Sequence, residues 1–114
     1  MNIRDLITDA ECAGSLAMVT HTPTPMTVVG GGERYFVSEG ACGFAWVKLY
    51  GVKLSTKVGK EFKACGFSKS YTGGLQYWVS GGGQSIERKE AFARAFAKVL
   101  TDRGFTAYAD SRMD

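Results

Sequence analysis

Few side chains in this sequence could act in catalysis, and their spacing favours no reaction. His21 is the only histidine, and it lies in the stretch 20–25, where two prolines indicate a linker. An imidazole activates a thiol only when the two are held together and a further group orients the base. His21 could in principle activate Cys12 or Cys42, but the sequence offers no third group. We therefore predict no catalytic residue and no enzymatic activity.

The residue types that bind metals also lack the required spacing. The three cysteines, Cys12, Cys42 and Cys65, are far apart and odd in number, so they suit neither paired zinc ligands nor a disulfide framework. The carboxylates of the second half lie on predicted helix surfaces and at the chain end, where solvation accounts for them. We expect no metal ion and no small-molecule cofactor. Unpaired thiols fit a reducing compartment, so we expect a cytoplasmic protein.

A glycine-rich loop, 80–85, leads from a predicted strand into a predicted helix that carries two cations in its first turn. Free backbone N–H groups, the helix dipole and these cations could hold an anion or a phosphate group. The candidate contacts are Gly82, Gly83, Ser85, Arg88 and Lys89. The loop lacks both the Gly-Lys-Ser/Thr ending of a phosphate-binding loop and the GxGxxG pattern of a dinucleotide site. A flexible connector is the competing interpretation.

The strand predicted over 43–50 has two chemically different faces. Ala45, Val47 and Leu49 alternate as a core face, and the residues between them place aromatic rings and a cation on the other side. The strand over 75–80 adds an amide and an indole to that second side, and the last strand adds a phenol. The candidate binding residues are Phe44, Trp46, Lys48, Tyr50, Gln76, Trp78 and Tyr108. Such a face can stack nucleic-acid bases, seat another protein, or be covered by the rest of the chain.

Caps, glycine stops and periodicity predict the elements that must position this face. They indicate strands over 43–50, 67–71, 75–80 and 105–110, with helices near 56–65 and 86–103. The order β-α-β-β-α-β is the split βαβ of the ferredoxin-like sandwich, an α+β fold with an antiparallel sheet. Two helices then cover one sheet face, and strands 43–50 and 75–80 lie together in the middle. A meander of strands over 26–80 with helices on one side is the alternative.

The first part of the chain has a different pattern. Residues 3–18 place apolar side chains at helical spacing, and a Thr/Pro linker follows, so we predict an N-terminal element, 1–25, and a single α+β domain, 26–114. Two short strands at 26–29 and 34–38 could flank a triple-glycine turn, and their pairing is left open. We expect the amphipathic helix to fold back over the aromatic sheet face or to dock on a neighbouring molecule.

Charge is unevenly distributed along the chain. Residues 1–42 contain two basic and five acidic side chains, a balance of −3, whereas residues 43–114 contain twelve and six, a balance of +6. The basic part could attract an anionic partner or the acidic leader. Lys57, Lys60, Lys63, Arg94 and Lys98 could add to a basic rim, or they could be the solvated sides of two helices. No apolar run is long enough to cross a bilayer, so we expect no membrane association.

Three segments of the second half, 40–47, 84–100 and 104–114, carry a resemblance to a known group. They are similar to small uncharacterised accessory proteins encoded by tailed bacteriophages and prophages. The resemblance extends over residues 40–114 and assigns no functional residue. It implies a protein that acts inside a bacterial host cell, in host takeover or against a defence system.

Two functional hypotheses follow. The first is a non-catalytic module that binds a host protein, as an interaction partner or an inhibitor, or that forms a homo-oligomer. The alternative is a single-stranded nucleic-acid-binding module that uses the aromatic face and the basic rim.

Overall fold

Three helices and six strands form in the part of the chain that the computed structural model describes, residues 2–30, 33–37, 40–81, 83 and 85–113. For residues 26–37 the description is of the backbone. In chain order the elements are α1 (Ile3–Thr20), β1 (Met26–Gly30), β2 (Glu33–Val37), β3 (Gly43–Tyr50), α2 (Lys57–Ala64), β4 (Ser68–Lys69), β5 (Leu75–Trp78), α3 (Ile86–Asp102) and β6 (Thr106–Met113).

Side-chain caps fix where the helices begin. The Asn2 side chain accepts a hydrogen bond from the Arg4 backbone N–H at 2.9 Å, and the Thr56 hydroxyl accepts one from the Gly59 N–H at 3.0 Å. Ser85 caps α3 in the same way. A polar side chain before the first turn satisfies N–H groups that have no partner within the helix, so these residues set the boundaries locally.

The main sheet confirms the predicted topology. Its strand order is β4-β5-β3-β6, and every neighbouring pair is antiparallel. Strands β3 and β5 therefore lie side by side in the middle, as the split βαβ arrangement requires. The α+β class and the helices near 56–65 and 86–103 are likewise confirmed.

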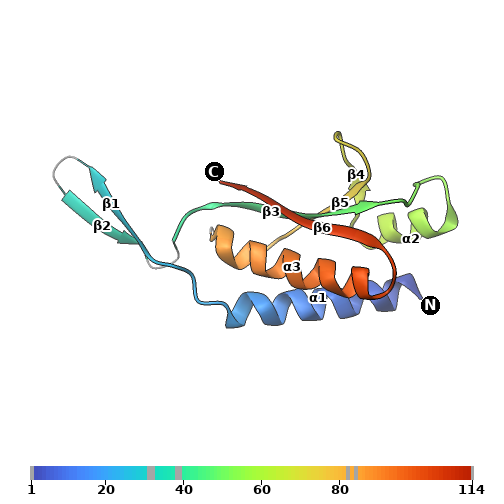
Figure 1. Cartoon of the computed structure of the whole chain (residues 1–114), viewed down its shortest axis with the longest axis horizontal. Coiled ribbons are helices and arrows are strands. Elements are labelled where there is room, and N and C mark those ends of the chain that lie inside the picture. The colour runs from blue at the N-terminus through green and yellow to red at the C-terminus, as the bar shows by residue number, and fades with distance from the viewer. Residues whose placement is uncertain (1, 31–32, 38–39, 82, 84, 114) are drawn as a thin grey trace.

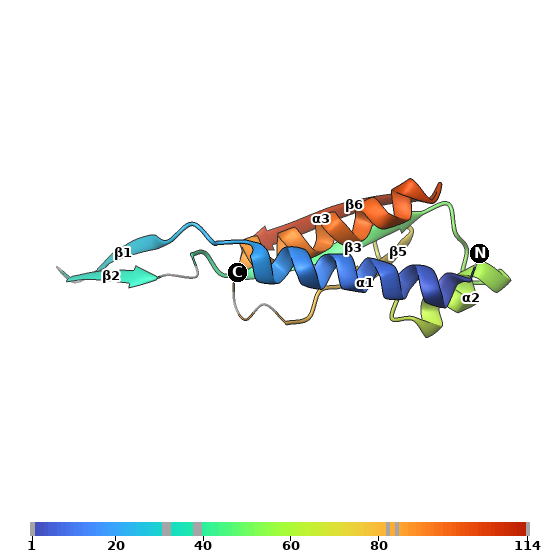
Figure 2. The same cartoon turned by 90° about the horizontal axis from the view of Figure 1, so that it is seen from below.

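The helices lie on one side of this sheet. Figure 1 shows α3 between the sheet and α1, and Figure 2 shows α1 running along α3 from below. Gly14 makes this close approach possible, because a Cβ at that position would lie 2.8 Å from the ring of Phe92. The expectation that the N-terminal helix covers the aromatic sheet face is wrong. Its apolar side is buried against α3, on the opposite side of the sheet.

One hydrophobic core joins the sheet to all three helices. The N-terminal helix contributes Ile3, Leu6, Ile7 and Ala10 to it. The sheet and the other helices contribute Ala45, Val47, Leu49, Phe62, Phe67, Leu75, Val79, Phe92, Ala93, Phe96, Ala97, Leu100 and Ala107. A domain boundary after residue 25 stays a prediction, but the helix before it packs into the same core as the sheet.

Three strands of the main sheet differ in length from their predicted ranges, and one of them, β5, ends at Trp78 and not at residue 80. Strand β4 contains only Ser68 and Lys69, because the Ser70 N–H turns to the Gly74 carbonyl, at 3.0 Å, and begins the connection to β5. The last strand continues to Met113, so it pairs with β3 along its whole length. The longer β6 extends the edge of the sheet.

Strands β1 and β2 form a separate antiparallel hairpin. The sequence had left open how these two strands pair, and the structure shows that they pair with each other. Both views show the hairpin projecting from one end of the molecule, beyond α1 and the main sheet (Figures 1 and 2). This projection accounts for the elongated shape, whose principal extents are 57 × 28 × 19 Å.

Candidate binding face on the open side of the sheet

Alternation along β3 decides which side chains face away from the helices. Ala45, Val47 and Leu49 are buried beneath the sheet in the helix-side core. Successive residues of a strand point to opposite faces, so Phe44, Trp46, Lys48 and Tyr50 lie on the open face. In the paired strands, Gln76 and Trp78 of β5 and Tyr108 of β6 share that face. The structure thus places all seven predicted binding residues on one surface.

The two tryptophans form the centre of this surface. Trp46 and Trp78 are direct cross-strand partners, and their ring centroids lie 4.8 Å apart. Phe44 meets Trp78 edge-on, at 6.3 Å. Trp78 still keeps 43% of its surface exposed. An indole in this position offers apolar area and a free ring edge to a ligand.

A second aromatic pair lies at the other end of β3. The rings of Tyr50 and Tyr108 meet edge to face with centroids 5.9 Å apart. Tyr50 is 38% exposed and Tyr108 is 57% exposed. Each phenol combines an apolar ring with a hydroxyl that can donate or accept a hydrogen bond.

Lys48, between the two aromatic groups, is not free to contact a ligand. Its side chain is buried, and its Nζ donates to the hydroxyls of Ser70 and Thr72 in the connection between β4 and β5. Its Nζ also lies 5.6 Å from the centroid of the Tyr50 ring. Lys48 therefore has a structural role, because its hydrogen bonds link the β4–β5 connection to the centre of the sheet. Gln76, its register partner on β5, is half-buried beside it.

Two further cations belong to the Phe44 end of the face. Lys89 Nζ donates to the Gly43 carbonyl at 2.9 Å and lies 5.3 Å from the Phe44 ring centroid. The guanidinium of Arg112, on β6, lies 5.5 Å from the same centroid. Asp110 shares this face through its register with Trp46. Asp110 and Arg112 are not among the residues predicted for this face, although the alternation through Tyr108 continues to them once β6 is extended.

Three of the proposed anion contacts of the glycine-rich loop, Ser85, Arg88 and Lys89, form hydrogen bonds within the chain. Gly82 lies outside the described residues, and Gly83 has a positive φ of 63°. The buried Ser85 hydroxyl accepts from the Arg88 backbone N–H, at 3.3 Å. The Arg88 guanidinium donates to the Met18 carbonyl at 3.1 Å, so it ties α3 to α1. Anion binding at this loop stays a prediction.

The residues with titratable side chains form no catalytic arrangement in the described part of the chain. His21 Nε2 lies 3.6 Å from the Glu87 carboxylate, and Cys12, Cys42 and Cys65 are all free thiols. The Thr24 backbone N–H, which donates to Glu87, is the largest cause that lowers the pKa of that carboxyl, and His21 adds to it. This cluster attaches the linker to the first turn of α3.

The Tyr77 hydroxyl is a second point of attachment on the helix side. It donates to the Glu11 carboxylate of α1 at 2.8 Å. Burial raises the pKa of Tyr77 above its usual range, and the nearby Glu11 carboxylate raises it further. The ring stacks on Phe96 with centroids 4.5 Å apart. Tyr77 therefore holds α1 in place and is not part of the open face.

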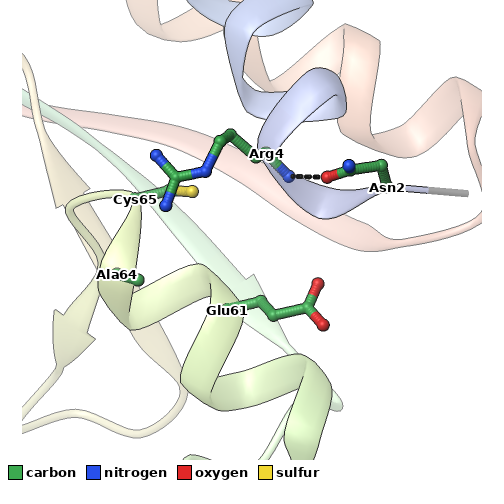
Figure 3. A pocket seen from close by; sticks show the side chains of 5 residues that line it. All are labelled: Asn2, Arg4, Glu61, Ala64 and Cys65. Carbon is green, nitrogen blue, oxygen red and sulfur yellow. Dashed lines mark hydrogen bonds between the residues drawn. The ribbon is translucent and has the colours of Figure 1, made fainter.

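A pocket of about 430 Å³ opens between the start of α1 and the end of α2 (Figure 3). It is lined by Asn2, Arg4, Glu61, Ala64 and Cys65. Figure 3 shows the Asn2 side chain turned to the Arg4 backbone as the helix cap, and the Arg4 guanidinium extending over the pocket towards Cys65. The lining includes a carboxylate, Glu61, and a thiol, Cys65, but Figure 3 shows the Glu61 carboxylate pointing away from Cys65. Among the described residues there is also no group of three or more side chains that could hold a metal ion.

Comparison of the chain with protein families, curated proteins and solved structures finds no match. The fold and the face therefore define the class of protein by themselves, an α+β protein whose sheet is covered by helices on one side and presents aromatic residues on the other. Within the described residues, no helix is both long enough and apolar enough to cross a membrane.

Proposed function

We propose that this chain is a non-catalytic protein–protein interaction module, and that the open face of its sheet binds a protein partner. The observation that carries the proposal is the position of α1, which packs on α3 and leaves Trp78, Tyr50 and Tyr108 exposed. Burying a large aromatic side chain contributes roughly 1.5–3 kcal/mol. A partner that covered these rings would gain this contribution, which the isolated chain does not realise.

The composition of the face favours a protein over a polyanion. Tyrosine, tryptophan and arginine are the residue types that most often dominate binding energy at protein interfaces. Two of the three cations near the rings are occupied, because Lys48 donates to two hydroxyls and Lys89 donates to a carbonyl. Asp110 adds a carboxylate to the same surface, and it would repel a phosphate.

The resemblance of residues 40–114 to phage accessory proteins supports a partner from the bacterial host. A small protein with an exposed aromatic face can act by covering a functional surface of a larger one. We accordingly propose inhibition of a host or defence factor as the biological role, within a bacterial cytoplasm.

Single-stranded nucleic acid is the second candidate, and one observation favours it. Phe44 and Trp46 on one central strand and Trp78 on the other occupy the position of the stacking rings in RNA-recognition motifs. Stacking is sequence-tolerant and contributes about 1–3 kcal/mol per base. Binding of this kind would weaken steeply as salt is added, because it depends on phosphate contacts.

A pull-down from bacterial host extract tests the proposal, with the wild-type protein and its Trp78→Ala variant each immobilised. We expect the wild type to retain a host protein that Trp78→Ala loses, with the contact then reproduced with the purified host protein. Val19→Ala is the matched control, because Val19 is 71% exposed but lies on α1, away from the sheet. Equal retention by Trp78→Ala would contradict the proposal.

A fluorescence titration separates the two candidates. The proposal predicts that single-stranded DNA and RNA leave the emission of Trp46 and Trp78 unchanged. Quenching by an oligonucleotide that weakens with salt would select the nucleic-acid function instead.

A further inference from the structure

The outer edge of β6 is long, and no strand in the described part of the chain pairs with it. The sheet order ends with β6, which contains eight residues, whereas the opposite edge strand, β4, contains two. A strand at the edge of a sheet presents unpaired N–H and C=O groups, which form a template for another strand. Short edge strands limit such pairing, so β4 is protected and β6 is open to it.

The direction of one hydrogen bond identifies the unpaired groups. The Ala45 carbonyl accepts from the Val79 N–H, at 3.0 Å, so Ala45 points its backbone groups towards β5. The alternate residues of β3 therefore bond to β6, and their partners include Asp110 and Arg112. It follows that the residues between them on β6 point their N–H and C=O groups outwards. These residues are Ala107, Ala109, Ser111 and Met113.

The side chains of this strand leave the edge open, with one local exception. The Ser111 N–H is met by the carboxylate of the preceding Asp110, at 2.8 Å. No proline interrupts the strand. A bond between neighbours in sequence is easily exchanged for a ladder bond, so Asp110 holds the Ser111 N–H without blocking a second strand.

Charges of opposite sign follow one another along the edge. A second copy related by a two-fold axis can therefore place a positive side chain opposite each negative one. On the open face, Asp110 and Arg112 lie two residues apart and have opposite sign. Beneath the edge, Glu90 and Arg94 of α3 line a small groove of about 100 Å³ together with Ala109, Asp110 and Ser111. Glu90 also accepts a hydrogen bond from the Ser111 hydroxyl. In an isologous contact, each residue of a pair meets the other residue in the second subunit.

We propose that β6 pairs antiparallel with β6 of a second copy of this chain, about a two-fold axis at Ser111. In this register Ser111 pairs with itself, and Ala109 pairs with Met113 of the other copy, through their outward backbone groups. Asp110 then lies directly opposite Arg112 of the second copy at a non-hydrogen-bonded position, where side chains approach most closely. A register centred on Asp110 would instead place two carboxylates opposite each other.

The result is a continuous eight-stranded sheet with both aromatic faces on the same side. This inference concerns the strand edge and does not depend on the proposed function of the open face. Dimerisation would double the aromatic surface that is offered to a partner, and it would leave Trp46, Trp78 and Tyr50 uncovered.

Charge reversal with sedimentation analysis tests the pairing on the full-length chain. We expect wild-type protein to be a dimer at micromolar concentrations. Asp110→Arg and Arg112→Asp each place like charges opposite one another twice, and we expect each to weaken the dimer at least about tenfold. The double variant, with both changes, restores the opposite-sign pairs and should dimerise as the wild type does. Asp9→Arg, at an exposed position of α1, is the matched control and should remain dimeric.

Mixing the two single variants is the most specific test. Each should be monomeric alone, but together they form complementary pairs at both symmetry-related contacts and should give a heterodimer. Circular dichroism before mixing shows that both are folded, which matters because Arg112→Asp also removes the cation beside Phe44. A monomeric wild type at several hundred micromolar, or a dimer that neither reversal affects, would overturn the inference. Neither outcome bears on partner binding through Trp78, which its own variant tests.

Discussion

The two faces of the four-stranded sheet carry rings of the same kinds in different surroundings. On the helix side, Tyr77 stacks on Phe96 at 4.5 Å, and α1 and α3 enclose them. On the open side, Trp46 and Trp78 lie tilted against each other with ring centroids 4.8 Å apart, and Trp78 remains 43% exposed. Since Tyr77 and Trp78 are neighbours on β5, aromatic content does not distinguish a core from a binding face. The position of the helices does.

Truncating one ring on each face should show the largest difference between them. Phe96 is fully buried, so Phe96→Ala should lower the free energy of unfolding by about 3–5 kcal/mol through a cavity and lost burial. Trp78→Ala loses mainly its contact with Trp46, and we expect about 1 kcal/mol. Urea denaturation of both variants measures the contrast. Equal losses would mean that the open face is as much a part of the core as the helix side.

The contact that keeps α1 away from the open face can be broken at Gly14. A side chain there would collide with the Phe92 ring, so Gly14→Val should lower the free energy of unfolding by about 1–3 kcal/mol. Ser15→Val, at the next and exposed position, is the control for helix propensity. Thermal unfolding would report the loss. A Gly14→Val variant as stable as Ser15→Val would contradict the packing of α1 on α3.

The open face has one buried charge, and its removal tests whether that charge is structural. Lys48→Met should lower the free energy of unfolding by about 1–2 kcal/mol, because the Ser70 and Thr72 hydroxyls lose the ammonium donor and keep only each other, 3.2 Å apart, and the Thr72 backbone N–H. The exposed Lys69→Met on β4 is the control and should have little effect. If Lys48→Met kept full stability but lost a ligand, Lys48 would be a binding residue after all.

The smallest expected effect lies at the linker. The pKa of Glu87 is lowered in the fold, so its ionised form contributes stability above the pKa of the unfolded carboxyl, and this contribution disappears as pH falls through the folded pKa. Glu87→Gln should therefore melt slightly below the wild type at neutral pH. The difference should vanish once the pH lies below the folded pKa of Glu87, where both side chains are neutral. A difference in melting temperature that persisted in acid would show that the charge of the Glu87 carboxylate is not what stabilises its contact with Thr24.

Local signals were sufficient to predict the elements. Thr56 and Ser85 cap helices because a hydroxyl before a first turn has N–H groups within reach, whatever the rest of the chain does. The alternation through Ala45, Val47 and Leu49 likewise sorted the two faces of β3 before any pairing was known. All seven predicted binding residues consequently lie on one surface. The end of β4 was less predictable, because a contact between Ser70 and Gly74 decides it.

The sequence by itself thus determined the α+β order, the helix starts and the division of β3 into two faces, since each depends on neighbours within a few residues. Only the tertiary structure decided that α1 packs on α3 through Gly14, that Lys48 is held by Ser70 and Thr72, and that β6 forms a free edge. These features join residues far apart in the chain. A pattern of spacing shows that a helix has an apolar side, but the shapes of the surfaces available in the folded chain select the one that it covers.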